Sequence, residues 1–216
     1  MVKTSVIIPC WIMDNTLYHL TQRCLETVRE TSKVELIVVD NGSTLGQHMM
    51  MEYADVYIRN QKNLGFTRAI NQGVMLATKE YLVIGNNDYF VEKGWEETLI
   101  DVLKNNPKYM TITPYTGGKK PEGVKSDIWE CFLPGSWYMI RKENFIHYGL
   151  YDEQFKNIFS DSDMAKKFYA VGYFMGETDR TKAEHYGSAT INKCHDNDTE
   201  YKETLAKFLN KWGVNG

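Results

Sequence analysis

Short apolar runs alternate with helical patterns along the first 115 residues, and this alternation limits the possible folds most. The apolar runs are rich in β-branched residues and cover residues 5–10, 34–40, 56–60, 81–86 and 109–114. Apolar residues at helical spacing cover residues 15–30, 66–77 and 94–105. Strands that alternate with helices are typical of βαβ units and a mainly parallel sheet. The sequence therefore predicts an α/β fold with helices flanking that sheet.

The remaining residues follow a looser pattern. Glycines and lysines predict a loop over residues 116–127, and aromatic residues predict strand over residues 129–140. Further helices are expected over residues 142–148, 163–170 and 200–212, the last of them amphipathic. A length of 216 residues fits one domain.

Charge and cysteine content exclude several classes of protein. A net charge of -3 argues against a protein that coats nucleic acid by charge alone, although it is compatible with a local basic patch. The four cysteines include no CxxC pair, which disfavours a zinc site or a disulfide framework. No stretch approaches the ~20 apolar residues of a membrane span, and the first residues lack the pattern of a signal peptide. We therefore expect a cytoplasmic protein without a transmembrane segment.

Polar residues follow three of the predicted strands directly, at the edge where open α/β sheets bind ligands. Asp40 either forms an Asx-type turn or accepts hydrogen bonds from a nucleotide base or ribose. Residues 63–73 form a glycine loop that leads into a helix. The first N–H groups of that helix would suit an anion, although glycine before a helix is common. Asp88 either belongs to a polar turn or holds Mg²⁺ or Mn²⁺ through its carboxylate.

Two later segments carry further candidate groups. Asp161 and Asp163 lie at the start of a predicted helix, where acids suit the helix dipole and Ser160 or Asp161 could simply cap the helix. His185 lies in a polar, glycine-containing segment. A lone histidine is more often structural than a ligand, so His185 becomes a candidate only if it lies beside Asp88.

Taken in order, these segments resemble the family 2 glycosyltransferases of GT-A fold, in particular the short rhamnosyltransferase-like members. The resemblance covers roughly residues 4–190 and rests on VIIPC, VVDNGS, NLGFTRAINQG, GNND, PGSWYMIRKENFIHYGLYDEQF, SDSD and HYGS. It implies transfer of a hexose or pentose from a nucleoside-diphosphate sugar to an acceptor hydroxyl. It also implies one domain over residues 1–216, with a nucleotide-sugar-binding half over about 1–115 and a smaller acceptor and catalytic half over about 116–216.

For the donor, the resemblance implies a role for five residues. Pro9 and Asp40 would line the nucleoside pocket. Asn63, Gly65 and Asn71 would shape the floor under the nucleotide.

For catalysis, Asn86 and Asp88 match the ends of the family's metal-binding Asp-X-Asp triplet, and His185 matches a histidine that completes the metal shell. The resemblance thus implies a divalent cation, Mn²⁺ or Mg²⁺, as cofactor. Asp152 would contact the transferred sugar or the acceptor. Asp161 matches the catalytic base, and one base on the face opposite the leaving group predicts inversion at C1.

The chain departs from the family pattern at two positions. Asn86 replaces a carboxylate of the triplet, so the affinity for metal would be modest. Ser160 replaces the acid that usually precedes the base, which makes Asp163 a second choice for the base. Arg180 and Lys182, just before the metal-shell histidine, could add positive charge at the departing diphosphate.

Other classes of function stay open at this point. A nucleotidyltransferase would share the sheet and the metal carboxylates, but CWIMDNT after the first strand lacks the usual glycine-rich, basic phosphate loop. A nucleotide-sugar-binding module with impaired catalysis is compatible with Ser160 and Asn86. The acceptor is equally open: a saccharide, a lipid-linked glycan or DNA carrying a hydroxylated base. Lys119, Lys120 and Lys125 in the loop either are only solvated or meet an anionic acceptor.

Overall fold

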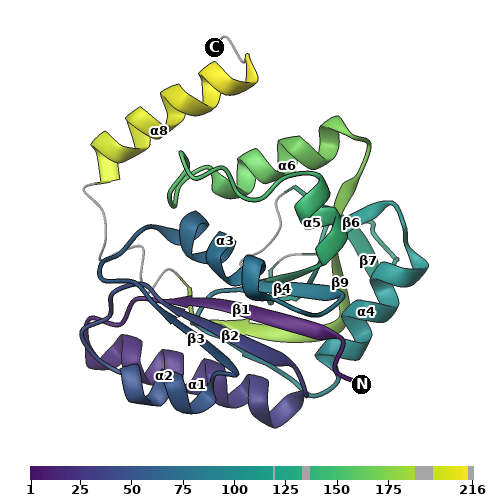
Figure 1. The fold of residues 1–216 in the computed structure, drawn as a ribbon. Coiled ribbons are helices and arrows are strands. Elements are labelled where there is room, and N and C mark those ends of the chain that lie inside the picture. The colour runs from purple at the N-terminus through teal and green to yellow at the C-terminus, as the bar shows by residue number, and fades with distance from the viewer. Residues whose placement is uncertain (119, 133–136, 188–196, 214–216) are drawn as a thin grey trace.

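The computed structural model describes residues 1–118, 120–132, 137–187 and 197–213 (Figure 1). The first elements alternate as the sequence predicts. They are β1 (Thr4–Cys10), α1 (Asn15–Thr31), β2 (Glu35–Asp40), α2 (Gln47–Tyr53), β3 (Val56–Arg59), α3 (Phe66–Leu76) and β4 (Tyr81–Gly85). The later elements are β5 (Tyr89–Val91), α4 (Trp95–Asn105), β6 (Tyr109–Tyr115), β7 (Ile128–Cys131), β8 (Trp137–Arg141), α5 (Lys142–His147), α6 (Ser160–Ala170), β9 (Phe174–His185) and α8 (Asn197–Trp212).

Three layers build the molecule, and strand β1 shows why. Its side chains alternate between the two faces of the sheet. Val6 and Ile8 pack into the apolar cluster that includes α1, α2 and α4, whereas Ile7 packs into the cluster that includes α3, α5 and α6. All three side chains are fully buried. The sheet is therefore covered on both faces by helices (Figure 1), which confirms the predicted α/β fold class.

The strand order is β3-β2-β1-β4-β8-β6-β9-β5, with β7 paired to β9. Strands β1 to β4 pair in parallel. Strand β8 pairs antiparallel with both β4 and β6, so the sheet is mixed beyond β4. The expectation of a mainly parallel sheet holds for β1 to β4, and farther along the sheet β6 also pairs in parallel with β9. Strand β8 is almost wholly buried, and an apolar run buried on both faces does not reveal the direction of its strand.

Three elements were not expected from the sequence. Helix α2 and strand β5 are short, and strand β9 alternates buried with exposed residues over a polar stretch. Strand β9 nevertheless pairs with β5, β6 and β7. Across the residues that the structure describes, no helix combines the length and the apolar composition that crossing a bilayer requires.

Pairing brings the candidate residues to one edge of the sheet. Because β1, β2 and β4 are parallel, their carboxyl ends at Cys10, Asp40 and Gly85 share that edge. The antiparallel pairing of β5 with β9 sets Tyr89 opposite His185. Residues almost a hundred positions apart thus meet where the parallel strands end.

Candidate functional site

Asp88 and His185 lie side by side at this edge. The backbone oxygen of Asp88 accepts a hydrogen bond from the N–H of Tyr186 at 3.1 Å, which joins the two segments. The Oδ1 atom of Asp88 lies 3.5 Å from the Nε2 atom of His185. Both atoms are buried, and neither has a hydrogen-bond partner within the described part of the chain. Buried polar atoms are nearly always satisfied in folded proteins, so this pair is suited to a ligand.

The chemistry of the pair fits a divalent cation. A carboxylate oxygen and an imidazole nitrogen are both established ligands of such ions. The ring of His185 stacks on Tyr89 with 4.2 Å between centroids, which fixes the plane of the imidazole. Asn86 is partly exposed, and its backbone oxygen accepts a hydrogen bond from the thiol of Cys24 at 3.6 Å. No group of three His, Cys, Asp or Glu side chains with metal-binding geometry is found among the described residues.

Arg180 and Lys182 do not join the Asp88–His185 pair. The guanidinium of Arg180 donates to Asp127 at 2.6 Å and to Asp101 at 3.3 Å. Arg180 is five positions before His185 in β9. Lys182 is exposed, and because side chains alternate along a strand it lies on the face opposite His185. The structure therefore gives no support to these two residues as extra positive charge at the pair.

Asp40 is the centre of a second cluster, which we call the Asp40 cluster: Asp40, Ser43, Tyr57 and Arg59. Asp40 is fully buried. Its Oδ1 accepts the N–H of Ser43 at 2.8 Å, which closes the turn after β2, and its Oδ2 accepts the hydroxyl of Tyr57 at 2.7 Å. Burial and this hydrogen bond raise the pKa of Tyr57 to about 12. Arg59 forms an ion pair with the same oxygen, and its side chain is 44% exposed. Arg59 is therefore the charged group that the cluster presents to solvent.

Asparagine side chains fix the loops after β2 and β3. Asn41 donates to Asn63 Oδ1 at 2.8 Å and to the Gly65 oxygen at 3.2 Å, and Asn63 Oδ1 also accepts the N–H of Gly65 at 2.9 Å. Gly65 has a φ of 92°, and a Cβ there would lie 2.9 Å from the Cβ of Lys156, so glycine is required. Pro9 lies one residue before the end of β1 and is partly exposed. Pro9, Asn63 and Gly65 therefore occupy the same edge as the Asp40 cluster.

The N terminus of α3 is closed to anions, contrary to the expectation from the glycine loop. The N–H of Phe66 donates to Asn157 Oδ1 at 3.0 Å. The N–H of Thr67 donates to the Lys156 oxygen at 3.1 Å. Because the chain itself satisfies these groups, they do not offer an anion site.

Asn71 binds the backbone of a distant segment. Its side chain accepts the N–H of Tyr151 at 3.1 Å and donates to the Tyr151 oxygen at 2.9 Å and to Glu153 at 3.3 Å. Asn71 is buried. It therefore connects α3 to the segment that carries Asp152.

Asp161 lies in the first turn of α6 and is the candidate base. Although part of the residue is accessible, dense surroundings desolvate its carboxyl and raise the pKa from 3.8 to about 7, against the effect of a hydrogen bond from Tyr151. A base works best when its pKa lies near the working pH. Asp161 therefore has the properties that proton removal from a hydroxyl requires at neutral pH.

Asp163 is engaged elsewhere. It is fully buried. Lys211 lies 2.6 Å from its Oδ1 and Lys167 lies 3.2 Å from its Oδ2. The indole N–H of Trp212 donates to Oδ1 at 3.0 Å. These contacts favour Asp161 over Asp163 as the base.

Asp152 is also held by the last helix. Lys211 approaches Asp152 Oδ2 at 2.8 Å. Burial acts to raise the pKa of Asp152, but hydrogen bonds from Lys211 and Gln154 outweigh it and lower the pKa to about 2. Helix α8 lies above α6 in Figure 1 and returns to this region from the far end of the chain. Asp152 is thus charged at neutral pH and positioned by α8.

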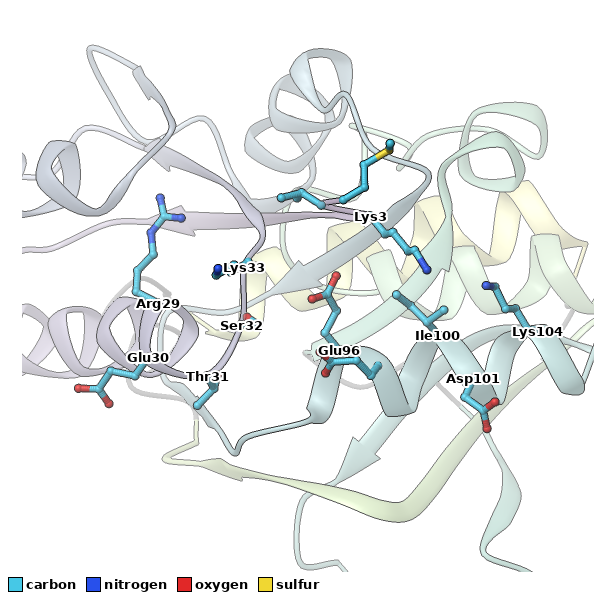
Figure 2. Close-up of a pocket in the computed structure, with 13 residues that line it drawn as sticks. Lys3, Arg29, Glu30, Thr31, Ser32, Lys33, Glu96, Ile100, Asp101 and Lys104 are labelled. Carbon is cyan, nitrogen blue, oxygen red and sulfur yellow. The ribbon is translucent and has the colours of Figure 1, made fainter.

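A charged groove of about 880 Å³ lies at the opposite end of β1 from these residues. Figure 2 shows basic and acidic side chains around it, among them Lys3, Arg29, Glu96 and Lys104. Strand β1 begins beside this groove and ends at Cys10, about 20 Å away. The groove is therefore separate from the candidate site.

Three residues of this region were not singled out by the sequence. Arg59 directly ends a strand, and Tyr151 adjoins Asp152 within GLYDEQF, so position alone was the available signal. Lys211 lies on an amphipathic helix whose sequence does not show what it packs against. All three make contacts between residues distant in sequence.

Comparison with known families fits this geometry. The model of the family described as "Glycosyl transferase family 2" matches residues 5–166. The chain belongs to glycosyltransferase family 2. A curated relative, the glucosyl-dolichyl phosphate glucuronosyltransferase of Haloferax volcanii, is 24% identical over 205 residues, which cover 89% of this chain and 62% of the relative. The chain thus spans less than two thirds of that protein.

Solved structures place the fold in the GT-A class. GalNAc-T7, solved with UDP, GalNAc and Mn²⁺, superposes with a TM-score of 0.72 at 15% identity over 86% of this chain and 44% of its own. Residues 1–349 of Staphylococcus aureus TarS, solved with UDP, superpose with a TM-score of 0.66 at 15% identity over 97% of this chain and 66% of its own. At this identity the likeness establishes the fold.

Proposed function

We propose that this chain is a metal-assisted, inverting glycosyltransferase in which Asp161 is the base and Asp88 with His185 holds Mn²⁺ or Mg²⁺. The proposed metal site is supported by one observation. Asp88 Oδ1 and His185 Nε2 are buried, face each other and have no hydrogen-bond partner among the described residues. The Mn²⁺ and UDP named with GalNAc-T7 support the same choice of cofactor and a nucleoside-diphosphate donor. A cation bound there would act as a Lewis acid on the departing diphosphate.

In the reaction that we propose, the acceptor oxygen attacks C1 of the donor sugar. A new C1–O bond forms, the bond from C1 to the diphosphate oxygen breaks, and its electron pair leaves with the diphosphate. The proton of the acceptor hydroxyl passes to the carboxylate of Asp161, whose pKa of about 7 leaves a large ionised fraction at neutral pH. Attack from the face opposite the leaving group gives inversion at C1.

On the donor side, we assign the nucleoside to the edge formed by Pro9, Asn63, Gly65 and the Asp40 cluster. Both oxygens of Asp40 are already bound within the chain. We therefore assign the direct contact to the exposed guanidinium of Arg59, with Asp40 holding Arg59 in place.

On the acceptor side, the proposal covers a saccharide, a lipid-linked glycan or DNA carrying a hydroxylated base. The name of the Haloferax relative includes a dolichyl phosphate substrate, which supports a lipid-linked glycan. Of the loop lysines, Lys119 lies outside the described residues, Lys120 pairs with Asp179 at 2.8 Å, and Lys125 is exposed. The rhamnosyltransferase-like subtype, the choice between hexose and pentose, and a cytoplasmic location stay predictions.

Release of nucleoside diphosphate from a panel of UDP-, GDP- and dTDP-sugars tests the proposal, with saccharide and lipid-linked acceptors. Turnover should require Mn²⁺ or Mg²⁺ and stop in EDTA. Asp161→Asn should lower kcat at least ~100-fold while calorimetry shows unchanged donor binding. Full activity in EDTA would overturn the proposed metal requirement. Full activity of Asp161→Asn would overturn the assignment of Asp161 as the base. Donor binding without turnover on any acceptor would indicate a binding module.

A further inference from the structure

The residue that precedes α6 has an unusual backbone conformation. Helices α2, α3 and α4 each begin directly after a glycine with a positive φ: Gly46 at 80°, Gly65 at 92° and Gly94 at 87°. Helix α6 begins in the same way, but the residue there is Phe159, with a φ of 62°. No other non-glycine residue in the described part of the chain has a positive φ. This conformation is strained for a large side chain, and such strain persists only where the surroundings stabilise it.

Aromatic rings of α8 surround the side chain of Phe159. The ring of Phe208 stacks on it, with 5.2 Å between centroids and 28° between planes, and the ring of Tyr201 lies 5.4 Å away. Phe208 also meets the fully buried ring of Phe155 at 6.1 Å, and only 9% of Phe208 is exposed. A glycine in place of Phe159 would adopt the backbone more easily but would make none of these contacts. The phenylalanine therefore joins α8 to the start of α6.

Helix α8 binds the first turn of α6 at a second point. The ammonium of Lys211 lies 2.6 Å from Asp163 Oδ1, and the indole N–H of Trp212 donates to the same oxygen at 3.0 Å. These two residues lie three and four positions after the stacking phenylalanine of α8, so they share its face of the helix. Asp161 lies between Phe159 and Asp163 in the sequence. The chain on both sides of the candidate base is thus attached to one face of α8.

The other end of the loop before α6 is held by α3. The N–H of Phe66 donates to Asn157 Oδ1 at 3.0 Å, and the N–H of Thr67 donates to the Lys156 oxygen at 3.1 Å. The loop is therefore bound by α3 near its middle and by α8 at Phe159. Because α3 anchors the earlier part, the contacts with α8 fix the direction in which α6 begins.

We propose that Phe208 is a positioning residue for sugar transfer: by stacking on Phe159 it holds the left-handed backbone there and so fixes the first turn of α6, which carries Asp161. This inference rests on the proposed function, in which Asp161 is the base. A catalytic group that is misplaced by about 1 Å can lose ~100-fold in rate. Phe208 therefore acts on turnover and not on binding of the donor, whose proposed contacts come from the ends of β1 to β3 and the loops after them.

Kinetics of variants in α8 test this role. Phe208→Ala should lower kcat roughly 10- to 100-fold, while calorimetry shows unchanged binding of UDP in the presence of Mn²⁺. Lys207→Ala is the matched control, because it removes an exposed side chain from the adjacent position of the same helix; its kcat should equal that of wild type. Circular dichroism at the assay temperature checks that each variant is folded. Phe208→Leu, which keeps apolar volume but removes the aromatic stack, decides the matter if Phe208→Ala does not fold.

Two substitutions of Phe159 separate the backbone from the ring. Phe159→Ala and Phe159→Gly both remove the ring, but only glycine adopts a positive φ at little cost. The kcat of Phe159→Gly should therefore exceed that of Phe159→Ala several-fold. Equal kcat values in the two variants would show that the left-handed backbone does not position Asp161, and the inference would be wrong.

Amide hydrogen exchange followed by NMR gives a readout that needs no turnover. The N–H of Asp163 donates to the Phe159 oxygen at 2.9 Å, and the N–H of Thr98 makes the equivalent bond, at 3.1 Å, in the first turn of α4. In Phe208→Ala, exchange at Asp163 should be roughly 10-fold faster, because the first turn of α6 opens more often. Exchange at Thr98 should keep its rate, which makes this amide the internal control.

The kinetic and exchange results together separate the inference from the proposed function. Unchanged exchange at Asp163 in Phe208→Ala would overturn the inference, because α8 would then not hold this turn. Unchanged kcat in Phe208→Ala, with Asp161→Asn inactive, would overturn the positioning role. If Asp161→Asn is fully active while exchange at Asp163 rises, the attachment of α8 is real and the proposed function is what fails.

Discussion

Asp40 and Asp88 both follow a buried strand of one sheet, yet the structure surrounds them very differently. Asp40 receives hydrogen bonds from Ser43 and Tyr57 and an ion pair from Arg59. The Oδ1 atom of Asp88 receives none from the described residues, and it faces an equally unsatisfied nitrogen of His185. A buried carboxylate whose oxygens both receive hydrogen bonds stabilises the scaffold. A buried carboxylate oxygen without a donor costs free energy of folding, and a bound ligand can offset that cost. The hydrogen-bond donors around an acidic residue therefore distinguish a structural role from a ligand-binding role better than its position on a strand does.

Replacing Asp88 should have the largest effect. In Asp88→Asn, sugar transfer with Mn²⁺ should fall on the order of 100-fold, because Lewis-acid help to the leaving diphosphate is worth several kcal/mol and each ~1.4 kcal/mol is tenfold in rate. The urea midpoint should not fall, because Oδ1 has no hydrogen bond to lose. Steady-state kinetics and urea unfolding measure the two effects. A variant that loses stability but keeps its rate would reverse the comparison.

Replacing Asp40 should lower the stability of the fold, which replacing Asp88 should not. Asp40→Asn should lower the free energy of unfolding by about 2 kcal/mol, since buried donors lose a charged acceptor. Tyr57→Phe removes one donor and should cost less. Urea unfolding measures both, and calorimetry with UDP tests binding. If Asp40→Asn weakens UDP binding with unchanged stability, the carboxylate contacts the nucleoside itself.

Asp161 extends the comparison, because its surroundings disfavour its charge. Its folded pKa of about 7 lies above the unfolded value of 3.8, so its contribution to stability is complete below 3.8 and is lost as pH rises through 7. Asp161→Asn should therefore be more stable than wild type at pH 8, by roughly 1–2 kcal/mol. That advantage should shrink as pH falls from 7 toward 4. Urea unfolding at several pH values gives the curve, and a constant difference would argue against the raised pKa.

Replacing Lys211 should have the smallest effect. This lysine of α8 pairs with Asp152 and Asp163, which lie far from it in the sequence. Lys211→Gln should lower the free energy of unfolding at pH 7 by about 1 kcal/mol, since the Lys211 side chain is 27% exposed and the buried Asp163 keeps its ion pair with Lys167. The pKa of Asp152 is lowered to about 2, so its stabilising contribution is present above 3.8 and is lost as pH falls through 2. The effect of the variant should decrease over that window. Lys207→Gln, on an exposed position of the same helix, should be neutral in thermal unfolding.

Apart from the short α2, the parallel half of the fold could be predicted because each strand and helix there has its own local pattern. The meeting of Asp88 with His185 was expected only through a family resemblance, and the structure shows the pairing of β5 with β9 that produces it. Strand β9 was missed, since its polar residues alternate with buried ones in a stretch without an apolar run. The direction of β8 was missed as well, because burial on both faces leaves no sign of direction.

Local sequence also could not reveal which acids are neutralised. Asp161 and Asp163 look alike in SDSD, yet Lys211 and Trp212 engage only the second of them. That choice depends on how α8 docks, and the helix pattern shows that a face is apolar without showing what it covers. Tyr151 was missed for the same reason, since its contacts come from α3, α5 and β8.

The long reach of Lys211 has a consequence for how the chain emerges from the ribosome. Arg59 follows Asp40 by 19 residues, but Lys211 follows Asp152 by 59. At ~5–20 residues per second, the first counter-charge arrives within roughly 1–4 seconds and the second after roughly 3–12 seconds. During that longer interval Asp152 lacks the lysine that pairs with it in the folded chain. The half that contains β1 to β4 can therefore assemble during translation, while the ion pairs of Asp152 and Asp163 with Lys211 wait for the last helix to be made.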